Sequence, residues 1–226
     1  MKRFYKSVEV VDRAIHLDGR PVRTPKRALL ALPTDALAEA VAAEWRAQGD
    51  EIVPGTMPFT GLSNAAIDIV TPDAPDFVRP LAAYAETDLT CYRAEGPASL
   101  VTRQAELWDP PLAWARARYD VTFEVVTGIS HRPQPFATVE RLAAALAARE
   151  AFELAGLYHL ITLGGSLVIA LMLHEGAIDA DAAWTAVQAD EDWQAEKWGV
   201  DDLAAKAQAA RRADFMAAAR FLELIR

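Results

Sequence analysis

The stretch at residues 154–173, LAGLYHLITLGGSLVIALML, most constrains the fold, because its 20 residues contain no charged side chain. A helix of this length can cross the apolar core of a bilayer. However, Gly164 and Gly165 lie near its centre, and the flanking charges are Glu153 and Glu175 rather than a basic cluster on one side. The central helix of a helical domain has the same character. Two interpretations remain: a membrane anchor, or a buried helix over 152–173 whose glycines let a neighbouring helix approach closely.

The rest of the chain predicts an α+β protein. Residues 6–12, 14–25 and 28–33 predict three short antiparallel strands, with Asp18 and Gly19 as a favoured hairpin turn. Thr34 can cap a helix that packs on this sheet and closes at Gly49. We therefore predict a small α/β domain over 1–58 and a helical domain over 59–226. The helices expected after the sheet unit cover 60–70, 73–87, 98–119, 138–150, 152–173, 180–197 and 201–224.

Two local features refine this expectation. Pro110 and Pro111 fall inside the pattern of helix 98–119 and are expected to interrupt or kink it. Residues 119–128 carry an alternating β-branched pattern, which fits either a short strand or an extended connection.

Charge and cysteine content exclude several classes of protein. The chain has 32 acidic and 23 basic residues, a net charge of -9, which disfavours binding to nucleic acid or to an anionic membrane surface. The single cysteine, Cys91, excludes an internal disulfide and a multi-cysteine zinc site, and is expected to be buried. The first residues lack the apolar stretch of a secretory signal, so a cytoplasmic location is expected.

The sequence contains no recognisable catalytic motif. Ser166 lacks the following glycine of a nucleophile elbow and is expected to be a packed helix residue. No two of the four histidines have the spacing of a metal-binding helix pair, and no phosphate-binding loop occurs. We therefore predict no catalytic residue, no metal and no cofactor.

One basic cluster is present in the predicted hairpin region, DGRPVRTPKR. It contains Arg20, Arg23, Lys26 and Arg27. A solvated hairpin is the favoured interpretation, and binding of phosphate or of an acidic partner is the alternative.

Residues 175–202 form an acidic stretch with nine acidic side chains and one basic side chain, Lys197. On one helix, Trp184, Glu191 and Trp198 would recur every seven residues, with Gln194 four residues before Trp198. The stretch could be a solvated face whose tryptophans dock the helix on the core. Alternatively, an exposed tryptophan bordered by carboxylates could anchor a basic, partly apolar surface of another protein. The pattern leaves both interpretations open.

An ordered series of segments resembles a known family along the full chain: RFYKSVEV, HLDGRPVRTPKRALLALPT, AEW, MPFTGLSNAAIDIV, ETDLTCYR, WDPPLAWA and DEDWQAEKWG. The chain is similar to bacterial members of the F1-ATPase assembly chaperones that bind the α subunit. The resemblance implies a non-enzymatic, monomeric chaperone that binds newly made α, prevents its aggregation and is replaced by the β subunit. It also implies a small N-terminal α/β domain followed by a helical domain.

The resemblance further implies which residues bind the partner. The acidic C-terminal motif of the family maps to Asp190, Glu191, Gln194, Trp198 and Gly199. Which of the two carboxylates matters is left open. The competing interpretations are a small acidic enzyme with a carboxylate-centred site between the two domains, and a membrane-anchored adaptor that uses residues 154–173.

Overall fold

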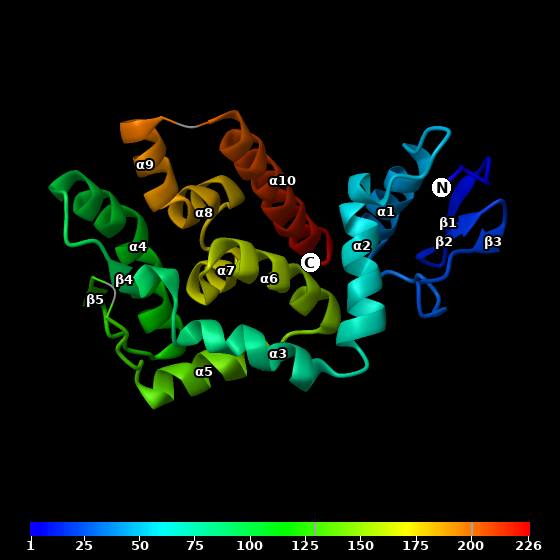
Figure 1. Cartoon of the computed structure of the whole chain (residues 1–226). Coiled ribbons are helices and arrows are strands. Elements are labelled where there is room, and N and C mark those ends of the chain that lie inside the picture. The colour runs from blue at the N-terminus through cyan, green and yellow to red at the C-terminus, as the bar shows by residue number, and fades with distance from the viewer. Residues whose placement is uncertain (129, 200) are drawn as a thin grey trace. The chain divides into compact units, whose positions relative to one another are not determined.

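The computed structural model describes residues 1–128, 130–199 and 201–226 (Figure 1). The chain divides into two compact units. The N-terminal unit consists of Met1–Phe77, Glu150–Gly156 and Ala217–Arg226, and the helical unit of Val78–Arg149 and Leu157–Met216. The two compact units are divided at positions other than the domain boundary expected between residues 58 and 59. That boundary stays a prediction.

The N-terminal unit contains the predicted antiparallel sheet, which has three strands in the order β1-β2-β3. These are β1 (Val8–Val11), β2 (Ala14–Leu17) and β3 (Arg20–Pro21). Asp18 and Gly19, with φ of 49° and 75°, form the expected hairpin turn between β2 and β3. The segment 28–33 is not a full strand and forms only isolated bridges, such as that between Ala14 and Ala31. Pro21 and Pro25 supply no N–H, which limits pairing here.

Helix α1 (Asp35–Arg46) covers this sheet. The predicted cap is confirmed, because the Leu37 amide donates to Thr34 Oγ1 over 3.1 Å. The core beneath the helix is formed by fully buried side chains from the sheet, from α1 and from the C-terminal end of the chain: Ile15, Leu30, Leu37, Val41 and Phe221. After the 3-10 turn η1 (Pro54–Thr56), α2 (Pro58–Ala65) continues as a π-helical turn, η2 (Ala66–Val70).

The helical unit is built from short and long helices. Its elements are the rest of α3 (Ala74–Ala82), the 3-10 turns η3 (Ala83–Ala85) and η4 (Leu89–Cys91), β4 (Tyr92–Arg93), α4 (Ala98–Tyr119), β5 (Val126–Thr127), α5 (Phe136–Ala147), most of α6 (Ala151–Gly164), α7 (Leu167–His174), α8 (Ala180–Val187), α9 (Ala189–Trp198) and the first part of α10 (Asp202–Leu224). Strands β4 and β5 pair in parallel, so residues 119–128 include a short strand.

Helix α4 covers the predicted range and continues through Pro110 and Pro111, so the two prolines do not interrupt it, and the alternative, a kink, stays a prediction. A proline inside a helix removes one N–H donor. Here the neighbouring turns hold the helix together, since Trp108 and Leu112 on either side of the two prolines are buried in the core. Packing therefore outweighs the local cost of the prolines.

The apolar stretch 154–173 is broken in the middle, which corrects the single helix expected over 152–173. Helix α6 ends at Gly164, Gly165 has a φ of +69°, and α7 begins after Ser166. Ser166 is therefore a helix cap rather than a helix residue: the Ile169 amide donates to its Oγ over 3.0 Å. In the part of the chain that the structure describes, no helix is long and apolar enough to span a membrane.

Close packing was predicted at both Gly164 and Gly165, and only Gly164 shows it: the nearest atom to a Cβ at Gly165 is Leu89 Cβ at 3.8 Å, an ordinary contact. A Cβ at Gly164 would lie 3.0 Å from Val187 Cγ1 of α8. At Gly156, which lies in the part of α6 that belongs to the N-terminal unit, a Cβ would lie 2.7 Å from Leu222 Cδ2 of α10. The absence of a side chain at Gly164 and at Gly156 lets a second helix pack against α6.

Cys91 is fully buried, as expected. Burial, with a contribution from the Asp88 carboxylate, raises the pKa of the thiol to about 12. Because the thiolate is the reactive form, this side chain is a packing residue rather than a nucleophile.

The carboxylate of Glu175 joins the end of α4 to Arg149. Its Oε2 accepts from Arg118 Nε over 2.6 Å, and its Oε1 accepts from the Tyr119 hydroxyl over 2.8 Å and from Arg149 Nη2 over 2.7 Å. Burial by itself would raise the pKa of Glu175, but the hydrogen bonds from Arg118, Tyr119 and Arg149 outweigh it and hold the pKa below its usual value.

We expect Glu175→Gln to lower the free energy of unfolding by about 2 kcal/mol at pH 7, since charged hydrogen bonds are lost. A carboxylate with a lowered folded-state pKa contributes stability above its unfolded pKa of about 4.3, and this contribution is lost as pH falls through the folded pKa. The difference between the two proteins should therefore shrink toward pH 3. Urea unfolding across this pH range measures it, with Glu140→Gln on the exposed face of α5 as control. A difference that stays constant with pH would contradict the prediction.

Candidate partner-binding surface

The acidic stretch forms two helices, α8 and α9, which meet at Gln188, so the single helix expected over 180–197 is wrong. Trp184 on α8 is buried and packs edge-to-face against Phe215 with 5.3 Å between ring centroids. Trp198 at the end of α9 is 75% exposed. The predicted seven-residue stripe through Trp184, Glu191 and Trp198 is therefore not a continuous surface, and the two tryptophans have different environments.

One face of α9 is attached to α4. The buried Gln104 donates from Nε2 to Asp190 Oδ1 over 2.7 Å, and its Oε1 accepts from the Ala94 amide over 2.8 Å. Arg103 forms an ion pair with Glu196, in which Nη2 donates to both carboxylate oxygens, at 2.7 Å and 2.9 Å. Trp193 is buried and donates to Ser99 Oγ over 3.2 Å. Asp190 thus positions the helix.

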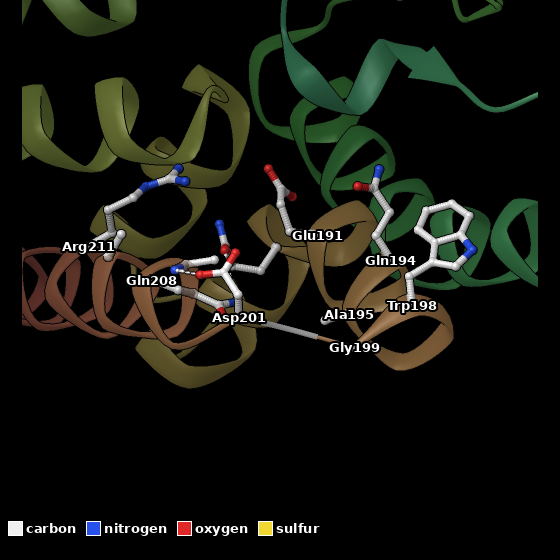
Figure 2. A pocket seen from close by; sticks show the side chains of 11 residues that line it. Glu191, Gln194, Ala195, Trp198, Gly199, Asp201, Gln208 and Arg211 are labelled. Atoms are coloured by element: carbon white, nitrogen blue, oxygen red, sulfur yellow. Dashed lines mark hydrogen bonds between the residues drawn. The ribbon is translucent and has the colours of Figure 1, made fainter.

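The other face of α9 forms one wall of a groove of about 410 Å³, which we call the acidic groove (Figure 2). Glu191, Gln194 and Trp198 share this face because they are three and seven residues apart on a helix. Helix α10 supplies the facing wall. The lining residues are Gln188, Glu191, Gln194, Ala195, Trp198, Gly199, Asp201, Ala204, Ala207, Gln208 and Arg211. Of the five predicted site residues, the structure brings together Glu191, Gln194, Trp198 and Gly199, whereas Asp190 does not line the groove.

Gly199 has a conformational role at the end of α9. Its φ of 80° and ψ of 174° lie in a region that is essentially restricted to glycine. Nothing lies within 4 Å of a Cβ built there, so the requirement comes from the backbone alone. This residue lets the chain leave α9 toward α10.

Among the charged groups on and around α9, Glu191 is distinguished by having no partner in the part of the chain that the structure describes. Asp192 accepts from Gln208 Nε2 over 2.9 Å, and Asp201 caps α10 by accepting from the Leu203 and Ala204 amides over 2.8 Å and 2.9 Å. Arg211 donates to the Leu163 carbonyl, near the end of α6, over 2.9 Å. Within residues 1–128, 130–199 and 201–226, Glu191 makes no hydrogen bond or ion pair and is exposed. It is the available carboxylate of the acidic groove.

Trp198 is exposed but oriented. Its ring meets that of Trp193 at 89° with 5.7 Å between centroids, a favourable edge-to-face arrangement. Because Trp193 is itself buried, its contact with the exposed indole of Trp198 helps to fix the orientation of that indole. The groove therefore offers an apolar ring, an amide and a free carboxylate on one helix face, which together can bind a basic and partly apolar surface. Among the described residues, no group of three or more histidines, cysteines or carboxylates could hold a metal ion.

Gln104 and the wall of α10, including Gln208 and Arg211, were not predicted from the sequence. One available signal was the spacing of Leu100, Gln104 and Trp108, which places an amide on the buried face of a helix. A buried amide needs partners, so its position indicates an anchor for a neighbouring segment. No comparable signal identifies α10, because its lining residues are mostly alanine and glutamine.

Comparisons with known proteins agree with this architecture. A model of the family described as ATP12 chaperone protein matches residues 2–116. The crystal structure of Atp12 from Paracoccus denitrificans is 39% identical with a TM-score of 0.94, over 100% of this chain and 98% of that one. The Atu1473 protein from Agrobacterium tumefaciens is 38% identical with a TM-score of 0.94, over 100% of this chain and 86% of that one.

A mitochondrial relative is more distant. The protein atp12 of Schizosaccharomyces pombe is 24% identical over 215 residues, which cover 88% of this chain and 74% of the relative. The fold, with a small antiparallel sheet followed by helices, also matches the predicted α+β class. The family match over residues 2–116 and the full-length structural match confirm the predicted resemblance, and the chain belongs to the ATP12 chaperone family of F1-ATPase assembly chaperones.

Proposed function

We propose that this protein binds the unassembled α subunit of F1 and prevents its aggregation until the β subunit replaces it. It acts as a monomeric chaperone without enzymatic activity, located in the bacterial cytoplasm, and its partner is neither nucleic acid nor membrane. Membership of the ATP12 chaperone family supports the general role. The identity of the partner subunit rests on the resemblance of the ordered sequence segments.

The observation that carries the proposal is that Glu191 and Trp198 both line the acidic groove on one face of α9. Tryptophan is favoured at the centres of protein interfaces because it buries a large apolar area at low entropic cost. A free carboxylate on the same helix face attracts a basic surface and speeds the encounter. Anchoring of α9 by Asp190 and Glu196 keeps both groups in place before the partner arrives.

The exposure of the site is consistent with transient binding. Complete burial of one large apolar side chain contributes about 2–3 kcal/mol. An interface with few such anchors releases its partner readily, because most differences in affinity arise in the dissociation rate. The β subunit could then displace the chaperone by burying the same area more completely.

We expect Glu191→Lys to weaken capture of the α subunit by about tenfold or more, because an attractive charge becomes a repulsive one. Tagged chaperone is tested in pull-downs against separately expressed α and β, and light scattering follows the aggregation of α. Wild-type protein should capture α but not β and suppress the scattering. Thermal unfolding should be unchanged, since the Glu191 side chain has no partner among the described residues.

Glu140→Lys is the matched control, since it makes the same charge change at an exposed position on α5 outside the acidic groove. Equal capture by the Glu191→Lys and Glu140→Lys variants would contradict the role of Glu191. Capture of β instead of α, or of neither subunit by the wild-type protein, would overturn the proposed function itself.

A further inference from the structure

A second groove, of about 570 Å³, lies within the N-terminal unit, and we call it the basic groove. Its walls come from the first residues of the chain, from β2 and β3, from the segment that follows them and from α1. The lining residues are Met1, Phe4, Tyr5, Leu17, Asp18, Arg20, Pro21, Val22, Arg23 and Trp45. This groove includes part of the basic cluster for which the proposed function has no use.

The floor of the basic groove is rigid and apolar. Tyr5 is 5% exposed, its hydroxyl donates to the Trp45 carbonyl over 2.6 Å, and the two rings meet edge-to-face at 5.7 Å. Arg3 lies 4.6 Å from the centre of the Tyr5 ring and donates from Nη1 to the Gln48 carbonyl over 2.6 Å. Leu17 packs in the same cluster. A ligand would therefore meet a preformed surface, at little ordering cost.

An exposed aromatic side chain borders this floor. Phe4 is 65% exposed, and its ring meets the edge of Tyr5 with 5.5 Å between centroids. Pro21 and Val22 also line the groove and add further apolar surface. A large exposed ring beside a concave apolar floor is typical of a binding site rather than of a solvated hairpin.

The uncompensated charge of the basic groove is positive. Arg20 and Arg23 are exposed, and within the described residues neither forms an ion pair with a carboxylate. Asp18 is already engaged: its carboxylate accepts from the Lys6 and Ser7 amides, at 3.0 Å and 2.8 Å, and from the Ser7 hydroxyl at 3.1 Å. This local charge contrasts with the net charge of -9 for the whole chain.

We propose that the basic groove binds an acidic, partly apolar peptide segment of a partner protein. Carboxylates of the segment pair with the guanidinium groups of Arg20 and Arg23, whose planar forks suit two-pronged contacts. An aliphatic or aromatic side chain of the segment packs against Phe4 and the Tyr5–Trp45 floor. The apolar floor favours a peptide over free phosphate, which would gain nothing from it. This site has the opposite charge preference to the acidic groove and does not depend on it.

The test uses a fluorescein-labelled peptide in which glutamate alternates with leucine and phenylalanine, and a matched peptide with lysine in place of glutamate. Fluorescence anisotropy with the full-length protein measures binding at low and high salt. We expect the glutamate peptide to bind, more weakly at high salt, and the lysine peptide not to bind through this groove. The overall negative charge opposes non-specific attraction of the glutamate peptide, so its binding reports a local site.

Reversal of the two arginines provides the decisive variant. Arg20→Glu combined with Arg23→Glu should weaken binding of the glutamate peptide by about tenfold or more. Arg132→Glu combined with Lys206→Glu makes the same change in net charge at exposed positions outside the groove and should have a much smaller effect. Phe4→Ser should also weaken binding, without a change in its salt dependence. Thermal unfolding establishes that each variant is folded.

Several outcomes would overturn the proposal. The first is that the glutamate peptide does not bind. The second is that the two double variants lose affinity for it equally. The third is that the lysine peptide binds as tightly as the glutamate peptide and that the arginine reversal abolishes its binding too. Binding of anionic lipid vesicles or inorganic phosphate in place of the peptide would assign the arginines to another ligand. Self-association that is lost on arginine reversal would make a second copy of the chain the occupant. Glu191→Lys should bind the glutamate peptide at least as well as wild type, so this test and that of α capture fail independently.

Discussion

Replacing Asp88 with alanine should lower the free energy of unfolding by about 4 kcal/mol, because it leaves several buried donors without an acceptor. Asp88 is completely buried in the helical unit. Its carboxylate accepts from Ser166 Oγ over 2.8 Å, from the Val168 amide over 2.9 Å and from Thr90 Oγ1 over 2.7 Å. These contacts hold the break between α6 and α7 and the start of α7. Urea unfolding at pH 7 measures the loss.

Asp88→Asn is the matched variant, since it keeps the shape of the side chain and one acceptor oxygen. Its amide group can replace only part of the acceptor capacity, so we expect a smaller loss, of about 2 kcal/mol. A loss below about 1 kcal/mol for the alanine variant would show that the buried network contributes little beyond its desolvation cost.

Replacing Trp108 with alanine should cost about 3–5 kcal/mol, the usual range for removal of a large buried aromatic side chain. Trp108 is completely buried and donates from Nε1 to the Ala186 carbonyl over 2.7 Å, which joins α4 to the end of α8. The substitution leaves a cavity, and it leaves the Ala186 carbonyl without this donor, two residues before Gln188 of the acidic groove. Unfolding in urea gives the change in stability, and α capture measured below the unfolding midpoint shows whether the groove survives.

Trp114→Ala is the control for this position, because Trp114 lies on the same helix but is only half-buried and packs edge-to-face on Tyr119 at 5.5 Å. It should cost clearly less than Trp108→Ala. Equal losses would show that the contact between α4 and α8 has no special importance.

Elements that depend on neighbouring residues could be predicted from the sequence. The turn at Asp18 and Gly19 follows from their tolerance of positive φ, and the start of α1 follows from the hydroxyl of Thr34. The bounds of α4 also agree with its pattern. These features use dihedral preferences and contacts within a few residues, so the sequence records them directly.

Breaks inside apolar or acidic runs could not be predicted in the same way. In the run at 154–173, Gly165 with its positive φ and the Ser166 cap are local signals for a break, but the apolar pattern continues across them. The break is also stabilised by Asp88, 78 residues from Ser166 in the sequence. Likewise, Pro110 and Pro111 remain inside α4 because the surrounding helix is packed. Contacts between distant residues decide such cases, and hydropathy does not encode them.

The sequence by itself determined the family, the α+β class and the acidic stretch that contains the candidate site. Only the tertiary structure decided which of its residues are available to a partner. Residues of α4 and α10 engage Asp190, Glu196 and Asp192, and Trp184 and Trp193 are buried in the helical unit. Because hydrogen bonding and burial depend on which helices meet, Glu191 and Trp198 are distinguished from chemically identical neighbours only once the chain is folded.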